Sequence, residues 1–377
     1  MKYACIFAAA VGIAASSVAS AQDATIVYRL GHDTVAVEQF SRTPTRLAGE
    51  SVTRAGLAIQ RIQYDVTLAA DGRPTAAVIR RRQADGSPFP NAPVEYRFTL
   101  RADSAKRQIV WKDSTQSQSF AAPNAFPAFP VYSYAPFELL YARGRARDSV
   151  LAIGLGGDAV GVIGLQSYAG DTLRMRGGTY QMLVRFDRDG RLQTTDGGLT
   201  TNKAIGTRAQ GRVDIAALAA AMKPTGVLSP RATAYAAFSR GPILVNYGRP
   251  AVRERTVWGG VLVPYDSIWR TGANEATHLA TSKTIALGDL TLAPGLYTLW
   301  TQHTRNGTFL IVNKQVGQWG TEYQPSQDLG RVKMDFARTA EHVEDFTINV
   351  RATAPNRGAI DFVWGDSMAT ANFTVRP

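Results

Sequence analysis

The sequence is almost devoid of cysteine, because Cys5 is the only one among 377 residues. Cys5 lies in an N-terminal stretch that we expect to be removed on export, so the mature chain is expected to contain no thiol. This excludes disulfides, cysteine-ligated metals and cysteine nucleophiles from the expected chemistry of the mature protein. Long apolar runs are missing too: no later stretch approaches the roughly 18 residues that a membrane-spanning helix needs.

Catalytic and cofactor motifs are equally scarce. The sequence has no G-x-S-x-G nucleophile elbow, and the spacing of Glu275 and His278 lacks the second histidine of a zinc-binding H-E-x-x-H motif. The glycine-rich stretch Gly154–Gly164 lies among strand-like segments with no helix after it, which does not fit a phosphate-binding loop. We therefore predict no cofactor and no metal, and favour a binding protein over an enzyme. A catalytic carboxylate pair stays open, since a sequence does not show distances.

Residues 1–21 have the composition of a cleaved signal peptide. Lys2 supplies the basic start, residues 5–18 are small and apolar, and residues 19–21 read Ala-Ser-Ala, a typical cleavage pattern. We expect cleavage between Ala21 and Gln22, which predicts a periplasmic or secreted protein.

The balance of charge is basic, with a formal net charge of +12. The excess is uneven: residues 22–232 hold 27 Lys and Arg against 18 Asp and Glu, whereas residues 233–377 hold 14 against 12. A basic half favours anionic partners such as acidic glycans, lipid headgroups or small anions, and export disfavours nucleic acid. The alternative is an ordinary solvated sheet face that is rich in arginine.

The region from residue 22 to residue 222 alternates apolar and polar residues with period two, which predicts antiparallel strands with one wet face. Asp71-Gly72 and Asp189-Gly190 have the composition of hairpin turns. Asp214 is placed to cap a short helix that must end before Pro224. We predict a curved sheet or half-barrel that carries a short helix.

Residues 114–137 interrupt this alternation. The segment is rich in Ser and Gln at first and then combines prolines with Phe126, Phe129, Tyr132, Tyr134 and Phe137. Proline fixes the backbone and removes donors, so a stiff loop is predicted rather than a strand. The loop is either a lid over an apolar cavity or, as we favour, a plug for an open sheet edge. A short helix is expected after it.

Residues 223–232 contain two prolines and a glycine and are predicted to be a linker. Residues 233–377 then show about ten short strand-like segments separated by turns, a spacing typical of a β-sandwich, with a jelly-roll connection as one option. The whole mature chain is therefore expected to be all-β and mainly antiparallel.

Four segments of the second half carry a family resemblance. They are VNYGRPAVRERTVWGGVLVPY, WRTGANEAT, LAPGLYTLW and VNKQVGQWGTEY, in that order. Together they resemble the exported bacterial family called domain of unknown function 2911, over about residues 240–375. The stretch after Trp300 departs from the family pattern, so neither His278 nor His303 is carried over. The resemblance implies a compact β-rich exported domain without an established activity.

The run from Pro264 to Leu279 is the densest mixture of aromatic, charged and amide residues in the chain, and it is the candidate site. Arginine side chains can bind carboxylate, sulfate or phosphate there, and tryptophan can stack on a sugar. The candidate ligand-binding residues are Tyr247, Arg249, Arg253, Tyr265, Trp269, Arg270, Asn274, Glu275 and Trp319.

A structural interpretation of the same run is that Arg270, Asn274 and Glu275 tie an irregular loop together, because its backbone groups need hydrogen-bond partners. The functional interpretation is an exported binding protein for a glycan or another anionic ligand. Two further functions stay open: a hydrolase or lyase that uses Glu275 with Arg270, and a lipid-binding protein that uses the N-terminal half-barrel.

Overall fold

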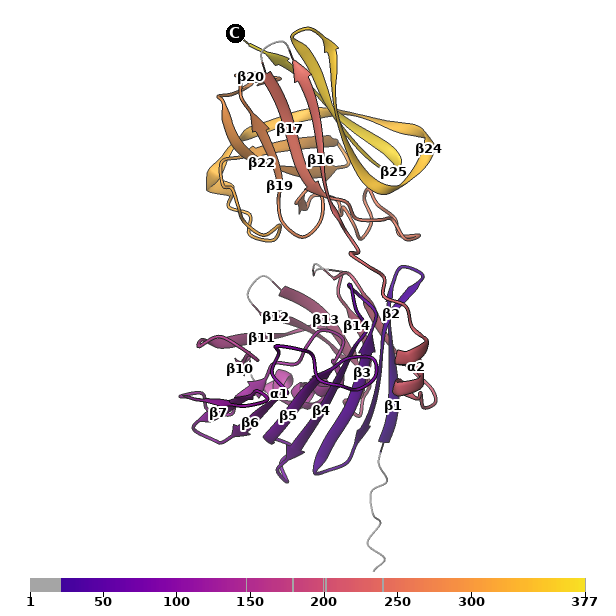
Figure 1. Ribbon diagram of the computed structural model, residues 1–377, viewed down its shortest axis with the longest axis vertical. Helices are drawn as coiled ribbons and strands as arrows, with labels where there is room; N and C mark the ends of the chain where they lie inside the picture. Colours follow the sequence, from indigo (N-terminus) through magenta and orange to yellow (C-terminus); the bar gives the residue numbers. More distant parts are fainter. Residues whose placement is uncertain are drawn as a thin grey trace, which may run out of the picture.

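The computed structural model describes residues 22–146, 148–177, 180–198, 200, 202–238 and 241–376. The expected signal peptide lies outside the described residues. Of the described residues, 59% lie in strands and 6% in helices, which confirms the predicted all-β class. Two large sheets lie one above the other along the longest axis of the molecule (Figure 1).

The N-terminal sheet is an open meander of fifteen strands, in which β1 pairs with both β2 and β15, and β8 and β9 form the two edges. The predicted hairpin turns are present, since Gly72 and Gly190 have the positive φ angles that such turns require. The strands are β1 Gln22–Leu30, β2 Asp33–Arg42, β3 Arg46–Thr53, β4 Gln60–Leu68, β5 Pro74–Arg82, β6 Glu95–Leu100, β7 Ala105–Val110, β8 Thr115–Phe120, β9 Phe126–Pro127, β10 Ser149–Ile153, β11 Val160–Ala169, β12 Thr172–Gly177, β13 Tyr180–Phe186, β14 Leu192–Asp196 and β15 Ile205–Ala209.

The Phe126–Phe137 segment, which we call the aromatic loop, fills the inside of this curved sheet. Phe126, Tyr132 and Tyr134 are buried in the N-terminal core, and the ring centroids of Tyr28 and Tyr132 lie 5.3 Å apart. Phe126 also begins the short strand β9, which pairs in parallel with β10 at the sheet edge. The favoured plug therefore describes the loop better than the lid. The 3-10 helix η1 Ala135–Phe137 and the helix α1 Glu138–Ala146 follow it.

The prediction that residues 114–137 contain no strand is wrong at two places, at the two-residue strand β9 and over a longer segment at the start of the range. Thr115–Phe120 forms the edge strand β8, which pairs with β7 along its whole length. Its polar side chains are mostly exposed on both faces. Backbone pairing is enough to hold a polar strand at an edge, where no apolar alternation is required.

The short helix α2 Ile215–Ala221 begins as predicted, because the Asp214 carboxylate accepts hydrogen bonds from the backbone N–H groups of Ala216 and Ala217. It packs against strands β2 and β3 through Ile215 and Ala219. The chain then runs along the N-terminal sheet, where Gly226 bridges to Gly56, before β16 begins.

The C-terminal sheet folds over on itself to enclose a core between two layers. Ile243, Val245 and Leu299 belong to one layer, and Phe346 and Trp364 to the other. The long strand β24 pairs first with β23 and then with β25, which carries the sheet from one layer to the next. The elements are β16 Arg231–Phe238, β17 Gly241–Gly248, β18 Ile268–Trp269, β19 Thr277–Thr281, β20 Ile285–Leu287, β21 Leu290–Leu292, β22 Gly295–Thr304, β23 Gly307–Asn313, η2 Pro325–Gln327, β24 Asp328–Ala354 and β25 Arg357–Val375.

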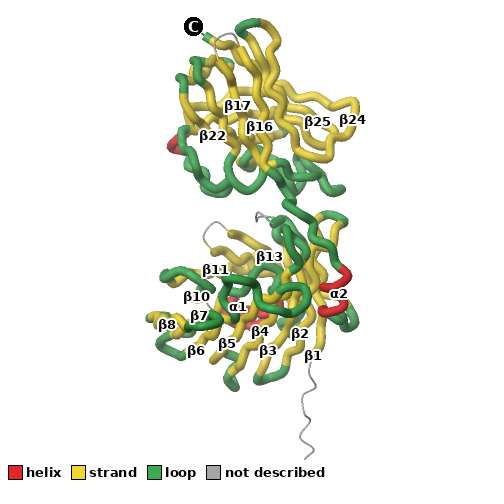
Figure 2. The backbone as a smooth tube through the Cα atoms, in the orientation of Figure 1, coloured by secondary structure: helices red, strands yellow, loops and turns green. Residues whose placement is uncertain are grey.

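Loops of both sheets, drawn in green, face each other in the space between the sheets (Figure 2). Within the described part of the chain, no helix has the length and apolar character needed to cross a membrane.

Candidate functional site: a cationic cavity between the two sheets

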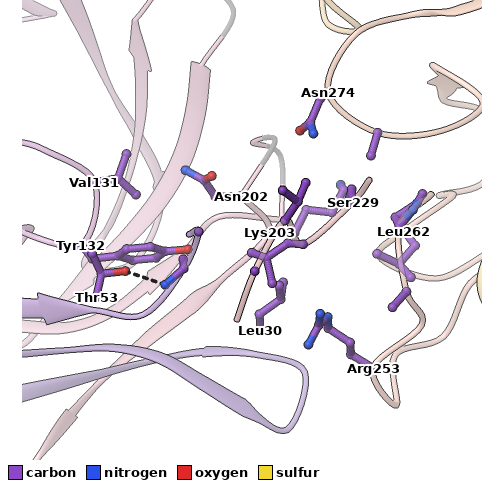
Figure 3. A pocket seen from close by; sticks show the side chains of 18 of the residues that line it. Leu30, Thr53, Val131, Tyr132, Asn202, Lys203, Ser229, Arg253, Leu262 and Asn274 are labelled. Atoms are coloured by element: carbon purple, nitrogen blue, oxygen red, sulfur yellow. Dashed lines mark hydrogen bonds between the residues drawn. The ribbon is translucent and has the colours of Figure 1, made fainter. Parts of the chain in front are cut away.

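A cavity of about 550 Å³ lies where the two sheets face each other. Its walls come from the end of the N-terminal half-barrel, from the segment before β16, and from the loops of the C-terminal sheet (Figure 3). Five cationic side chains line it, and none of the described lining residues is Asp or Glu. The cationic residues are Arg81, Lys203, Arg253, Arg255 and Arg270.

The Pro264–Leu279 run supplies five of the lining residues: Trp269, Arg270, Gly272, Ala273 and Asn274. Trp269 lies in the short strand β18, which pairs with β22, and its ring stacks on Trp364 at 5.5 Å between centroids. The hydroxyl groups of Thr271 and Thr301 lie 2.8 Å apart, and Thr277 donates to the Thr271 carbonyl over 2.7 Å. These contacts hold Arg270 and Asn274 at the rim of the C-terminal sheet.

Arg270 is the least satisfied of the five cations. Its Nε atom is buried and has no hydrogen-bond partner among the described residues. Burial lowers the pKa of this guanidinium to about 10. Gly320 makes room for the side chain, because a Cβ there would overlap Arg270 Cδ. The guanidinium is therefore held in place by packing and presented to the cavity without a counter-charge.

Lys203 approaches the same region from the N-terminal sheet. Its ammonium donates to the Gly198 carbonyl over 2.7 Å and to the Val261 carbonyl over 3.3 Å, so it bridges the two sheets. Burial lowers the pKa of Lys203 to about 8, and the positive charges of Arg270 and Arg255 add to this effect, while Asp196 opposes it weakly.

Arg255 completes the cationic group. Its guanidinium donates to the carbonyl oxygens of Val252 and Ala251, over 2.9 and 2.8 Å. Burial lowers the pKa of Arg255 to about 10, with repulsion from Arg253 as the second cause, while the Glu344 carboxylate opposes both. Neutral carbonyls orient this side chain but do not cancel its charge.

A turn-to-turn contact joins the two sheets beside the cavity. The Arg253 guanidinium pairs with Asp33, and His32 lies 3.6 Å from the Glu254 carboxylate. Arg253 and Glu254 both have positive φ angles, and the Arg253 N–H donates to Glu344 over 2.8 Å. Gly31 fits against this turn only because it lacks a side chain, since a Cβ would overlap the Arg253 carbonyl oxygen.

We expect Gly31→Ala to loosen this contact. Gly31 and Gly72 both have positive φ, so alanine at either position should cost about 1–2 kcal/mol of backbone strain. Only the Gly31 substitution also collides with Arg253, whereas a Cβ at Gly72 would meet nothing within 4 Å. Amide hydrogen exchange at residues 253 and 254 should therefore accelerate in Gly31→Ala and not in Gly72→Ala. Equal exchange in both variants would contradict the contact.

Among the predicted site residues, Arg253, Trp269, Arg270 and Asn274 line this one cavity. The others lie elsewhere. Tyr247 is buried in the C-terminal core with its ring edge-on to Phe346. Arg249 braces the second layer, donating to the Phe346 carbonyl over 3.3 Å.

Tyr265 is half exposed, but its ring is already in contact with two other side chains. His303 stacks on it at 5.1 Å, and the Arg305 guanidinium lies 4.9 Å from its centroid. Burial lowers the pKa of His303, whose Nδ1 lies 2.8 Å from the Thr308 hydroxyl.

Glu275 does not meet Arg270 in the cavity. Its carboxylate is exposed and lies 3.6 Å from Arg231, and its backbone bridges to Trp319. Trp319 is 40% exposed and does not line the cavity either. An acid–base role for Glu275 with Arg270 therefore has no support in this arrangement. Among the described residues, no group of three His, Asp or Glu side chains is placed to hold a metal ion.

Sequence reasoning missed Lys203 and Arg81 as site residues. Both belong to the N-terminal unit, far along the chain from the Pro264–Leu279 run. Arg81 lies in the basic triplet Arg80–Arg82, but successive residues of a strand point to opposite faces, which argued against an anion site there. Lys203 was indicated only by the basic excess of residues 22–232.

The C-terminal unit also matches a known family. Residues 229–373 match the model of a family described as Protein of unknown function (DUF2911). This segment confirms the DUF2911 resemblance. The matched segment includes β16 to β24, most of β25 and the cavity residues from Ser229 to Trp364. The N-terminal half-barrel, which supplies Lys203, lies outside it.

A comparison with solved structures found a similarity to a crystal structure of a beta-barrel-like protein of domain of unknown function DUF1849 from Brucella abortus. The identity is 12% and the TM-score 0.33, and the match covers 52% of this chain and 95% of that chain. A comparison with curated proteins found no match.

Proposed function

We propose that this protein is an exported binding protein that holds a small anionic ligand in the cavity between its two sheets. The observation that carries the proposal is Arg270, a partly buried side chain whose Nε atom is buried without a hydrogen-bond partner, in a cavity with five cations and no carboxylate among the described lining residues. A buried charge without a partner is costly, so it persists where a ligand or function compensates it.

The alternative interpretation, in which Arg270 ties the loop together, fits other residues better. Arg249 donates to a carbonyl and lies 3.4 Å from the Thr347 hydroxyl, as a loop brace should. The loop around Arg270 is instead held by its own threonines and by the Gly320 N–H, which donates to the Asn274 carbonyl over 2.8 Å. The Arg270 side chain is therefore not needed to satisfy this backbone.

The ligand class follows from the lining. Carboxylate, sulfate and phosphate groups accept the paired hydrogen bonds that guanidinium groups donate. An acidic glycan carries the same groups and belongs to the same proposal. Burial is the main cause of the lowered Lys203 pKa, and an anion between Lys203 and Arg270 would relieve the repulsion that adds to it.

Arg270→Met separates binding from bracing. Methionine keeps most of the length but removes a partly buried charge that has no carboxylate partner among the lining residues, so we expect the melting temperature without ligand to stay equal or to rise. A panel of anions should raise the melting temperature of the wild-type protein by mass action, and this rise should be lost in the variant. Differential scanning calorimetry measures both.

Arg249→Met is the matched control. It removes hydrogen bonds to the second layer of the C-terminal sheet, so it should lower stability by about 1–3 kcal/mol and leave anion binding intact. The proposal fails if Arg270→Met behaves like Arg249→Met, or if it keeps its response to anions.

A further inference from the structure

The cavity is not lined by cations alone. Val131 and Val227 are 40% and 57% exposed, and both face this cavity from different segments. Val131 belongs to the aromatic loop of the half-barrel, and Val227 belongs to the segment before β16. Leu30, Ile62 and Leu155 line the same end. Converging exposed apolar side chains mark a binding surface more often than scattered ones do.

The cationic group carries more charge than one carboxylate would cancel. Asp33 already pairs with Arg253, but Lys203, Arg255 and Arg270 have no carboxylate partner among the residues that line the cavity. They reach it from both sheets, so a single bound group can contact all three only between the sheets. A dianionic head such as a phosphate monoester offers three acceptor oxygens and roughly −1.5 to −2 charges near neutral pH.

We infer that the ligand is an amphipathic anion, with a phosphate-type head held by Lys203, Arg255 and Arg270 and an apolar body that lies against Val131, Val227 and the mouth of the half-barrel. This inference rests on the proposed function and adds the body of the ligand to its charge. The filled core of the half-barrel limits the apolar body to the cavity itself, because the Phe126–Phe137 loop occupies the space below.

Isothermal titration of the purified protein tests the two ends of the ligand separately. Octyl phosphate, used below its micelle concentration, supplies both ends; inorganic phosphate supplies the head alone; glucose 6-phosphate supplies the head on a polar body. We expect octyl phosphate to bind at least about tenfold more tightly than either of the others, because only it buries an apolar chain. If octyl phosphate binds no more tightly than inorganic phosphate, the inference of an apolar ligand body is wrong, whereas the proposal of an anion site is unaffected.

Variants assign the two ends. Val131→Asn and Val227→Asn change exposed side chains, so folding should be preserved, and each should weaken octyl phosphate several-fold without changing phosphate binding. Val162→Asn is the control, since Val162 is 54% exposed and does not line the cavity. Arg270→Met should weaken the binding of octyl phosphate and of inorganic phosphate by about tenfold or more.

The remaining outcomes overturn the inference in distinguishable ways. Tighter binding of glucose 6-phosphate than of octyl phosphate would replace the apolar body with a polar one. Binding of octyl phosphate that survives Arg270→Met would place it outside this cavity. If none of the three compounds binds, the inference of a phosphate-type head is wrong. The melting-temperature experiment with the wider panel of anions then tests the proposed function separately.

Discussion

Glu138→Ala is expected to lower the free energy of unfolding by about 3–5 kcal/mol, because it leaves two arginines facing a buried, empty position. The Glu138 carboxylate is 1% exposed and lies 3.0 Å from both Arg42 and Arg208. It also accepts the Leu192 N–H over 2.9 Å. These three partners come from β2, β15 and β14, so one side chain ties helix α1 to the curved sheet around it.

Asp65→Ala is the control for Glu138→Ala. Asp65 pairs with Arg46 on the surface, with side-chain exposures of 37% and 61%, so its loss should cost about 1 kcal/mol or less. Urea denaturation of the two variants and the wild type measures the difference. A cost for Glu138→Ala that is as small as that for Asp65→Ala would mean that water replaces the buried carboxylate.

Stability is expected to fall as the pH rises from about 4.5 to about 7, and Glu38 is the cause. Glu38 is fully buried, and burial raises its pKa to about 7, although four donors oppose the shift. The donors are the hydroxyls of Tyr28 and Tyr64 and the N–H groups of Tyr134 and Ala135. This carboxyl joins the aromatic loop to the inner face of the half-barrel.

The sign follows from proton binding. Between the unfolded pKa of about 4.5 and the folded pKa of about 7, the folded state holds a proton on Glu38 that the unfolded state has lost. The contribution of Glu38 to the free energy of unfolding is therefore complete below pH 4.5 and is lost as the pH rises through 7. This difference between the folded and unfolded pKa values corresponds to about 3 kcal/mol of unfolding free energy.

Glu38→Gln should remove this part of the pH profile. Burial lowers the pKa values of His278 and His303, so both histidines favour stability at higher pH and oppose the Glu38 effect in the wild type. Hydrogen bonds to Asp366 and Glu344 raise the pKa of His342, which acts in the same direction as Glu38. The variant keeps all three histidines, so the difference between the two profiles isolates Glu38. Identical slopes between pH 4.5 and 7 would show that Glu38 stays ionised in the folded protein.

Both carboxylates show where sequence patterns stop being informative. Glu38 lies at a core-facing position of an alternating strand, and Glu138 lies just after the aromatic loop. Each is buried by elements distant in the chain, including Tyr64 in β4 for Glu38 and Arg208 in β15 for Glu138. Local alternation predicts which face a residue occupies, but it does not show which distant donors satisfy it.

In the candidate site, too, the local sequence pattern predicted some of the residues and not others. The sequence singled out Trp269, Arg270 and Asn274 because they are adjacent and chemically rich, and they share one wall of the cavity. Glu275 is their neighbour in the sequence, yet it points toward Arg231 instead. Adjacent residues in an irregular loop face different directions, and only backbone angles such as the positive φ of Thr271 and Asn274 decide them.

The sequence by itself determined the all-β class, the turns, the Asp214 cap and the DUF2911 resemblance, because each depends on side-chain periodicity or on residues close together in the chain. The tertiary structure alone decided that the aromatic loop fills the half-barrel and that Lys203 meets Arg270 between the sheets. Those contacts join segments that are far apart in the sequence, and they arise only when both sheets have folded and their loops face each other.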